Sequence, residues 1–142
     1  MSYTVKVKEE ISTIKSTKSE IIAELSGYIK NNSTFHEKKV TMTTENKFLI
    51  DRVTNSLKFL YNNNSKVEII ENLNFSKNAL YQITLEDNLD YILNDLGIRD
   101  KKGNYFKTVP EYIVGANEEI RAYLRGTFLS SGSINDPKKS RY

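Results

Sequence analysis

The side chains of this chain that could do chemistry are hydroxyls, amides and amines rather than nucleophiles. Its 142 residues contain no cysteine, which excludes disulfides, thiolate metal sites and cysteine nucleophiles. The single histidine, His36, argues against a histidine-built zinc site and against a Ser-His-Asp triad. Threonine, glutamine and lysine can donate hydrogen bonds to phosphate oxygens and to base edges. A net charge of +3 permits nucleic-acid binding without requiring it.

Alternation of apolar and polar residues predicts the strands that would carry these donors. Four strands are expected, over 34–37, 40–44, 66–71 and 79–85. In the second, Val40 and Met42 face one way and the threonines between them face the other. Such half-polar strands fit an antiparallel sheet with one face covered by helices and one face open. The open face is then predicted to carry Thr41, Thr43, Lys66, Glu68, Gln82 and Thr84, with Lys38, Lys39 and Lys77 in the hairpin turns.

Helical periodicity supplies the elements that hold the sheet. Helices are predicted over 4–16, 19–31, 45–61, from Asp87 to Gly97, and from 117 onward, with a short one after Pro110. The predicted N-caps are Ser19, Thr44, Asp87 and Asn117. The order through residue 98 is therefore α-α-β-β-α-β-β-α, followed by a turn-rich connector.

Two of these helices carry the same stripe of small residues at a constant offset of 99. The stripes are Ala23, Gly27 and Asn31 in the first helix and Ala122, Gly126 and Ser130 in the second. A glycine inside a helix costs ~1 kcal/mol relative to alanine, so a helix that keeps one needs a reason. Close approach of two backbones is such a reason. The match predicts a duplicated unit built around a seam between paired helices.

These two helices resemble the LAGLIDADG motif of homing endonucleases, and the whole chain resembles the WhiA family of bacterial sporulation regulators. The match is carried by 2–10, 44–46, 93–98, 109–111 and 123–137, of which the last is the most specific. The resemblance implies an α+β fold with one LAGLIDADG-like α-β-β-α-β-β-α unit and an antiparallel sheet. It implies a first unit with its N-terminal helix over 1–98, a connector over 99–116 and the start of a second unit over 117–142.

Thirteen residues, 130–142, are too few to complete a second unit, so we expect the sequence to be the N-terminal part of a longer protein. In the resembled WhiA family, the remainder would finish that unit and add a helix-turn-helix.

In homing endonucleases each motif helix ends in an acidic residue, and the two acids hold divalent metal for phosphodiester cleavage. Alignment on the two glycines places these positions at Asn32 and Ser131, which carry no charge. The second motif aspartate falls at Lys30 and Leu129. The sequence thus keeps the features of the fold and lacks those of catalysis. We expect no enzymatic activity, no cofactor and no metal site.

In the resembled fold the open sheet face lies across the major groove of DNA. The predicted DNA-binding residues are Lys38, Lys39, Thr41, Thr43, Lys66, Lys77, Gln82 and Thr84. The alternative is a solvated sheet surface, and Glu68 and Glu71 in the same region would oppose phosphate. Between 38 and 86 seven basic residues stand against five acidic ones, a balance of +2. Arg121 and Arg125 make the C-terminal end basic, or form the exposed side of an amphipathic helix.

The resemblance implies a non-catalytic DNA-binding transcriptional regulator of the WhiA type, linked to sporulation, cell division and chromosome segregation. A LAGLIDADG homing endonuclease (or a splicing relative) and a protein-interaction domain derived from one remain the alternatives. The expected partners are double-stranded DNA and other regulatory proteins, with no membrane and no small-molecule substrate. No apolar run approaches the ~20 residues of a membrane span, and the expected location is the cytoplasm, at the nucleoid.

Overall fold

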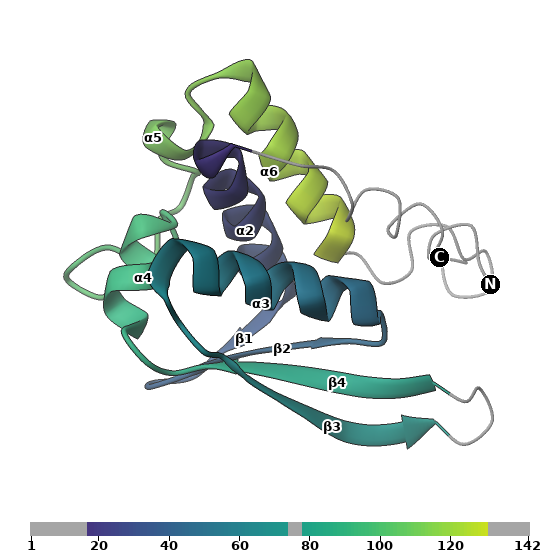
Figure 1. Ribbon diagram of the computed structural model, residues 1–142. Helices are drawn as coiled ribbons and strands as arrows, with labels where there is room; N and C mark the ends of the chain where they lie inside the picture. Colours follow the sequence, from purple (N-terminus) through teal and green to yellow (C-terminus); the bar gives the residue numbers. More distant parts are fainter. Residues whose placement is uncertain (1–16, 74–77, 131–142) are drawn as a thin grey trace, which may run out of the picture.

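The computed structural model describes residues 17–73 and 78–130, as a layer of helices on one face of a four-stranded sheet (Figure 1). The helix predicted over 4–16 lies outside the described residues, as do Lys77 and Ser131. The elements are α2 (Lys18–Asn32), β1 (Ser33–Phe35), β2 (Val40–Thr44), α3 (Lys47–Tyr61), β3 (Lys66–Leu73), β4 (Asn78–Leu85), α4 (Leu89–Asp95), α5 (Glu111–Val114) and α6 (Asn117–Ser130). This is the α+β arrangement predicted for a LAGLIDADG-like unit.

The sheet is antiparallel throughout, with strand order β1-β2-β4-β3. On its helix-facing side Val40 and Met42 of β2 lie beside Leu85 and Ile83 of β4, and all four are buried. Helix α3 covers them with Leu49, Val53, Leu57 and their neighbours, which form one core with the apolar residues of α4. Burial of one sheet face leaves the opposite face to polar side chains, as period-2 alternation predicts.

Helix α2 begins earlier than predicted. Thr17, not Ser19, is the N-cap, because Thr17 and Glu20 form a capping box. The Thr17 hydroxyl accepts a hydrogen bond from the Glu20 amide, and the Glu20 carboxylate accepts one from the Thr17 amide at 3.1 Å. Ser19 has no carboxylate three residues later and cannot form the reciprocal pair.

Three other predicted caps are displaced by one or two residues. Asn46 caps α3 through two amide hydrogen bonds, and Thr44 only accepts one from the Asn46 amide. Asn88, at φ 59°, precedes α4 in place of Asp87, without a side-chain cap bond. Asn117 is already the first residue of α6, and the amide of Ala116 before it donates to the Glu119 carboxylate. The predicted helix starts are therefore close to the observed ones, although the capping residues differ.

Gly97 ends α4 in the left-handed conformation, at φ 68°. A Cβ at this position would lie 2.8–2.9 Å from side-chain atoms of Ile113 and Pro110. Glycine therefore serves both the backbone turn and the packing of the connector that leads to α5. From α5 the chain enters α6, which packs along α2 (Figure 1). Among the described residues no helix is both long and apolar enough to cross a membrane.

Candidate nucleic-acid interface

One row of hydrogen-bonding side chains crosses all four strands on the face away from the helices. The register pairs Thr34 of β1 with Thr41 of β2, Thr41 with Thr84 of β4, and Thr84 with Lys66 of β3. Thr34 and Lys66 are exposed, Thr41 is half-buried and Thr84 is buried. The row places three hydroxyls and one ammonium group in a line across the sheet, perpendicular to the strands.

A second row lies beside the first and includes an acid. Thr43 of β2 pairs with Gln82 of β4, which pairs with Glu68 of β3. The Glu68 carboxylate lies 3.6 Å from the Lys66 ammonium, with both side chains well exposed. An exposed pair of this kind contributes at most ~1 kcal/mol to stability. Its effect on this face is electrostatic, because it partly neutralises the one lysine that these two rows contain.

Two of the predicted turn lysines lie beyond the end of β1 and not within these rows. Lys38 and Lys39 are exposed in the turn between β1 and β2, whereas Lys77 lies outside the described residues. His36 lies near the first row, with its Nε2 atom 3.4 Å from the Thr41 hydroxyl. The sequence prediction missed Thr34 as a member of this face. Two signals could have identified Thr34. It is the polar neighbour of the apolar Phe35, and it lies across the hairpin from Thr41.

Asn32, one of the two positions where the LAGLIDADG motif carries an acid, serves as a structural amide. Its Nδ2 donates to the Tyr28 hydroxyl at 2.9 Å and to the Thr43 carbonyl at 3.2 Å. The second bond fastens the end of α2 to β2. Burial raises the pKa of Tyr28 to about 12, and the hydrogen bond from Asn32 opposes that shift. A neutral amide with two hydrogen bonds offers a divalent cation no negative charge.

The two glycines predicted for the helix seam lie where α2 and α6 touch. A Cβ on Gly27 would overlap the Tyr123 carbonyl oxygen and lie 3.2 Å from the Thr127 amide nitrogen. A Cβ on Gly126 would overlap the Glu24 carbonyl oxygen and lie 3.0 Å from the Tyr28 amide nitrogen. Backbone therefore meets backbone at both positions.

The remaining seam residues divide into two groups. Ala23 and Ala122 are fully buried. Asn31 is exposed and donates to the Gly27 carbonyl at 2.8 Å, while the Ser130 hydroxyl donates to the Thr127 carbonyl at 2.6 Å. The alanines and glycines form the close contact, and the two polar residues satisfy helix carbonyls at its end.

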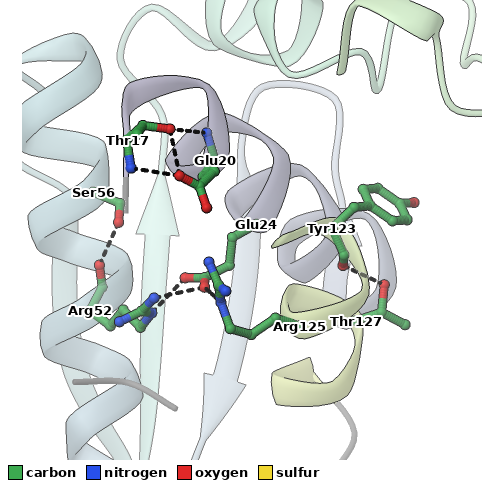
Figure 2. A network of polar contacts seen from close by, with 8 residues as sticks. All are labelled: Thr17, Glu20, Glu24, Arg52, Ser56, Tyr123, Arg125 and Thr127. Atoms are coloured by element: carbon green, nitrogen blue, oxygen red, sulfur yellow. Dashed lines mark hydrogen bonds and ion pairs between the residues drawn. The ribbon is translucent and has the colours of Figure 1, made fainter. Parts of the chain in front are cut away.

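A buried ion cluster joins three helices beside the seam (Figure 2). Glu24 of α2 is 7% exposed and binds the guanidinium groups of Arg52 from α3 and Arg125 from α6. Arg52 is bidentate, with Nε 2.5 Å from one carboxylate oxygen and Nη2 2.7 Å from the other, and the Arg125 Nε lies 2.5 Å from the latter oxygen. Sequence reasoning missed this cluster and assigned Arg125 to an exposed helix side or a basic terminus. Only Arg121 of that pair is exposed.

The two matching helices differ in how much of their apolar surface is buried. Leu25 of α2 is 3% exposed and packs into the core above the sheet. Its counterpart at the offset of 99, Leu124 of α6, is 59% exposed. Ile120, the counterpart of Ile21, is also exposed. Among the described residues, α6 therefore exposes a leucine whose counterpart in α2 packs into the core above the sheet.

Comparison with known protein families identifies this arrangement. Residues 18–99 match the family described as the WhiA N-terminal LAGLIDADG-like domain, and residues 120–142 match the WhiA LAGLIDADG-like domain. The chain belongs to the WhiA family. Two relatives, each called "Probable cell division protein WhiA", come from Pediococcus pentosaceus, at 33% identity, and Streptococcus agalactiae, at 34%. Each is matched by the whole chain, which covers 47% of the relative's length.

Solved WhiA structures share the fold. Full-length DUF199/WhiA from Thermatoga maritima superposes with a TM-score of 0.62 at 22% identity, covering 98% of this chain and 42% of that one. The N-terminal LAGLIDADG domain of DUF199/WhiA superposes with a TM-score of 0.64 at 20% identity, covering 97% and 62%. These solved structures share the fold of this chain.

Proposed function

We propose that this protein is a non-catalytic regulator of the WhiA type that binds double-stranded DNA with the outer face of its sheet. The observation that carries the proposal is the row of Thr34, Thr41, Thr84 and Lys66 across all four strands, in which Thr34, Thr41 and Lys66 reach solvent and the buried Thr84 lies between them. Four strands span three inter-strand spacings, roughly 14 Å. The major groove of B-DNA is ~12 Å wide, so the row matches it in size. The proposed cellular role is transcriptional control linked to sporulation, cell division and chromosome segregation.

The proposed binding is mainly electrostatic, with hydroxyl groups that position the duplex. Hydroxyl and ammonium donors bond phosphate oxygens, which fixes orientation without reading sequence. The modest charge of this region, and the Glu68 carboxylate beside Lys66, keep the affinity low. We expect a Kd on the order of 10⁻⁴–10⁻⁶ M that weakens steeply as salt rises, as for non-specific binding.

The non-catalytic part of the proposal rests on Asn32. Its amide is committed to Tyr28 and Thr43, at the end of the motif helix where a nuclease of this fold would place a metal-binding acid. The names of the WhiA relatives agree, since they refer to cell division and not to a nuclease.

Titration of a fluorescent DNA duplex, followed by anisotropy at several salt concentrations, tests the proposal. The double variant K38E/K39E should weaken binding about tenfold or more and flatten the salt dependence, because it removes two phosphate partners. K101E/K102E is the matched control, since it makes the same charge change at two exposed lysines of the connector. Equal losses in both double variants would show that only net charge matters, and would refute the sheet face as the interface.

A further inference from the structure

Strand β3 is the outer edge of the sheet. Within the described residues it pairs with β4 alone, and Figure 1 shows it as the outermost strand, with α3 lying over the inner ones. An edge strand presents unpaired N–H and C=O groups along its free side. Proteins usually protect such edges with short strands, charges or proline, because an unprotected edge pairs with other chains. At eight residues, Lys66–Leu73, β3 is not a short edge.

Its first half also exposes apolar side chains. Val67 is 41% exposed and Ile69 is 62% exposed. Their partners in β4 are Ile83 and Tyr81, so both side chains lie on the helix-facing side of the sheet, where α3 lies mainly over the inner strands β2 and β4. Adjacent apolar side chains at an unpaired sheet edge are the combination that marks a site of strand addition.

We propose that the β3 edge pairs with the β3 edge of a second copy of this chain, antiparallel, about a two-fold axis at Val67. Such an axis stands perpendicular to the sheet and keeps the helices of both copies on the same face. In an antiparallel pair, the side chains of two directly opposed residues point to the same side of the sheet. Because side chains alternate along a strand, the two-fold axis must pass through a residue and its copy, and it cannot pass between two neighbouring residues. An axis at Lys66 would bring the loop before β3 into the pairing, and an axis at Ile69 or Ile70 would bring in the register shift, so the candidates are Val67 and Glu68.

Two independent features select Val67. An axis at Glu68 would place the two Glu68 carboxylates opposite each other. It would also pair Ile70 with Lys66 of the second copy, although the ladder is irregular between Ile69 and Glu71. An axis at Val67 opposes Lys66 to Glu68 of the second copy, twice, and uses the regular stretch before the shift. Opposite charges on directly paired residues are favourable, and like charges are unfavourable.

The pairing does not require DNA, although Lys66 belongs both to the proposed DNA-binding row and to the β3 edge. It joins two four-stranded sheets through a few residues of each copy, well below the ~1,200 Å² of a stable interface. The expected dimer is therefore weak, with a Kd on the order of 10⁻⁴ M.

Cysteine cross-linking tests the register, because the chain has no cysteine of its own. Opposed Cα atoms in antiparallel strands lie ~4.5–5.5 Å apart, within the range of a disulfide. Oxidation of V67C at ~100 µM should give a disulfide-linked dimer, and K66C should link efficiently only when mixed with E68C. F59C is the control, because Phe59 is 66% exposed but lies on α3. Cross-linking of V67C no faster than that of F59C would overturn the proposal.

Exchanging the charges of Lys66 and Glu68 tests whether β3 pairs with a second copy of itself or with a different partner. In sedimentation equilibrium, K66E should weaken self-association about tenfold, because both charge pairs become repulsive. The double variant K66E/E68K should restore it, since the exchanged side chains again place opposite charges across the two-fold axis. Association that ignores K66E but is lost in L124D would place the contact on α6 and overturn the proposal. A chain that stays monomeric to ~1 mM would overturn it as well.

Discussion

Replacing Gly126 with alanine is expected to destabilise the protein, although alanine is the better helix former. Alanine gains ~1 kcal/mol over glycine in a helix. The added Cβ, however, would overlap the Glu24 carbonyl oxygen and sit 2.9 Å from the Glu24 carbonyl carbon. Both are backbone atoms, so no side-chain rotation relieves the overlap and the helices must separate. Overpacking of this kind costs ~1–3 kcal/mol, and we take the upper end because backbone has to move.

The expected net loss is therefore ~2 kcal/mol, which for a chain of this length lowers Tm by about 8 °C. Thermal unfolding followed by circular dichroism measures it, and Gly27→Ala should behave in the same way. Gly115→Ala is the matched control, since φ there is −73° and the nearest atom to a built Cβ is the Glu111 carbonyl oxygen at 3.0 Å. That variant should stay within ~1 kcal/mol of the parent protein. Stabilisation by both seam substitutions would refute the paired-helix seam.

Further expectations concern the ion cluster, catalysis and pH. Glu24→Gln leaves the buried guanidinium groups of Arg52 and Arg125 without their carboxylate, and should cost ~3 kcal/mol in urea unfolding; a loss below ~0.5 kcal/mol would contradict the cluster. The protein should not nick supercoiled plasmid with Mg²⁺ or Mn²⁺; nicking that co-purifies with the protein and disappears on Asn32→Ala would contradict a non-catalytic role. Because burial raises the pKa of Tyr28 from 10.0 to about 12, the unfolded chain ionises first. Stability should then fall between pH 10 and 12, and Tyr28→Phe should lessen that fall by ~2–3 kcal/mol.

The strands, the helices and the pairing of two helices could be predicted from the sequence alone. Periodicities of 2 and 3.6 residues are local properties, so strands and helices could be assigned from neighbouring residues alone. The constant offset between Gly27 and Gly126 identified the two helices that pack together, because an interior glycine needs a close contact. The capping residues could not be assigned in this way, since several hydroxyl, carboxylate and amide residues compete at each boundary. The reciprocal bonds of Thr17 and Glu20 decided one of them.

Apart from that helix pair, contacts between residues that are distant in the sequence depend on how the elements pack, and the sequence did not predict them. The register between strands placed Thr34, Thr41, Thr84 and Lys66 in one row, and alternation within a strand says nothing about its neighbour's register. Glu24, Arg52 and Arg125 come from three helices far apart in the sequence, and each resembles an ordinary surface charge until the helices pack. The exposed edge at Val67 and Ile69 likewise depends on strand order. Patterns along the chain reflect the direction of each side chain, whereas partners depend on how whole elements are arranged in space.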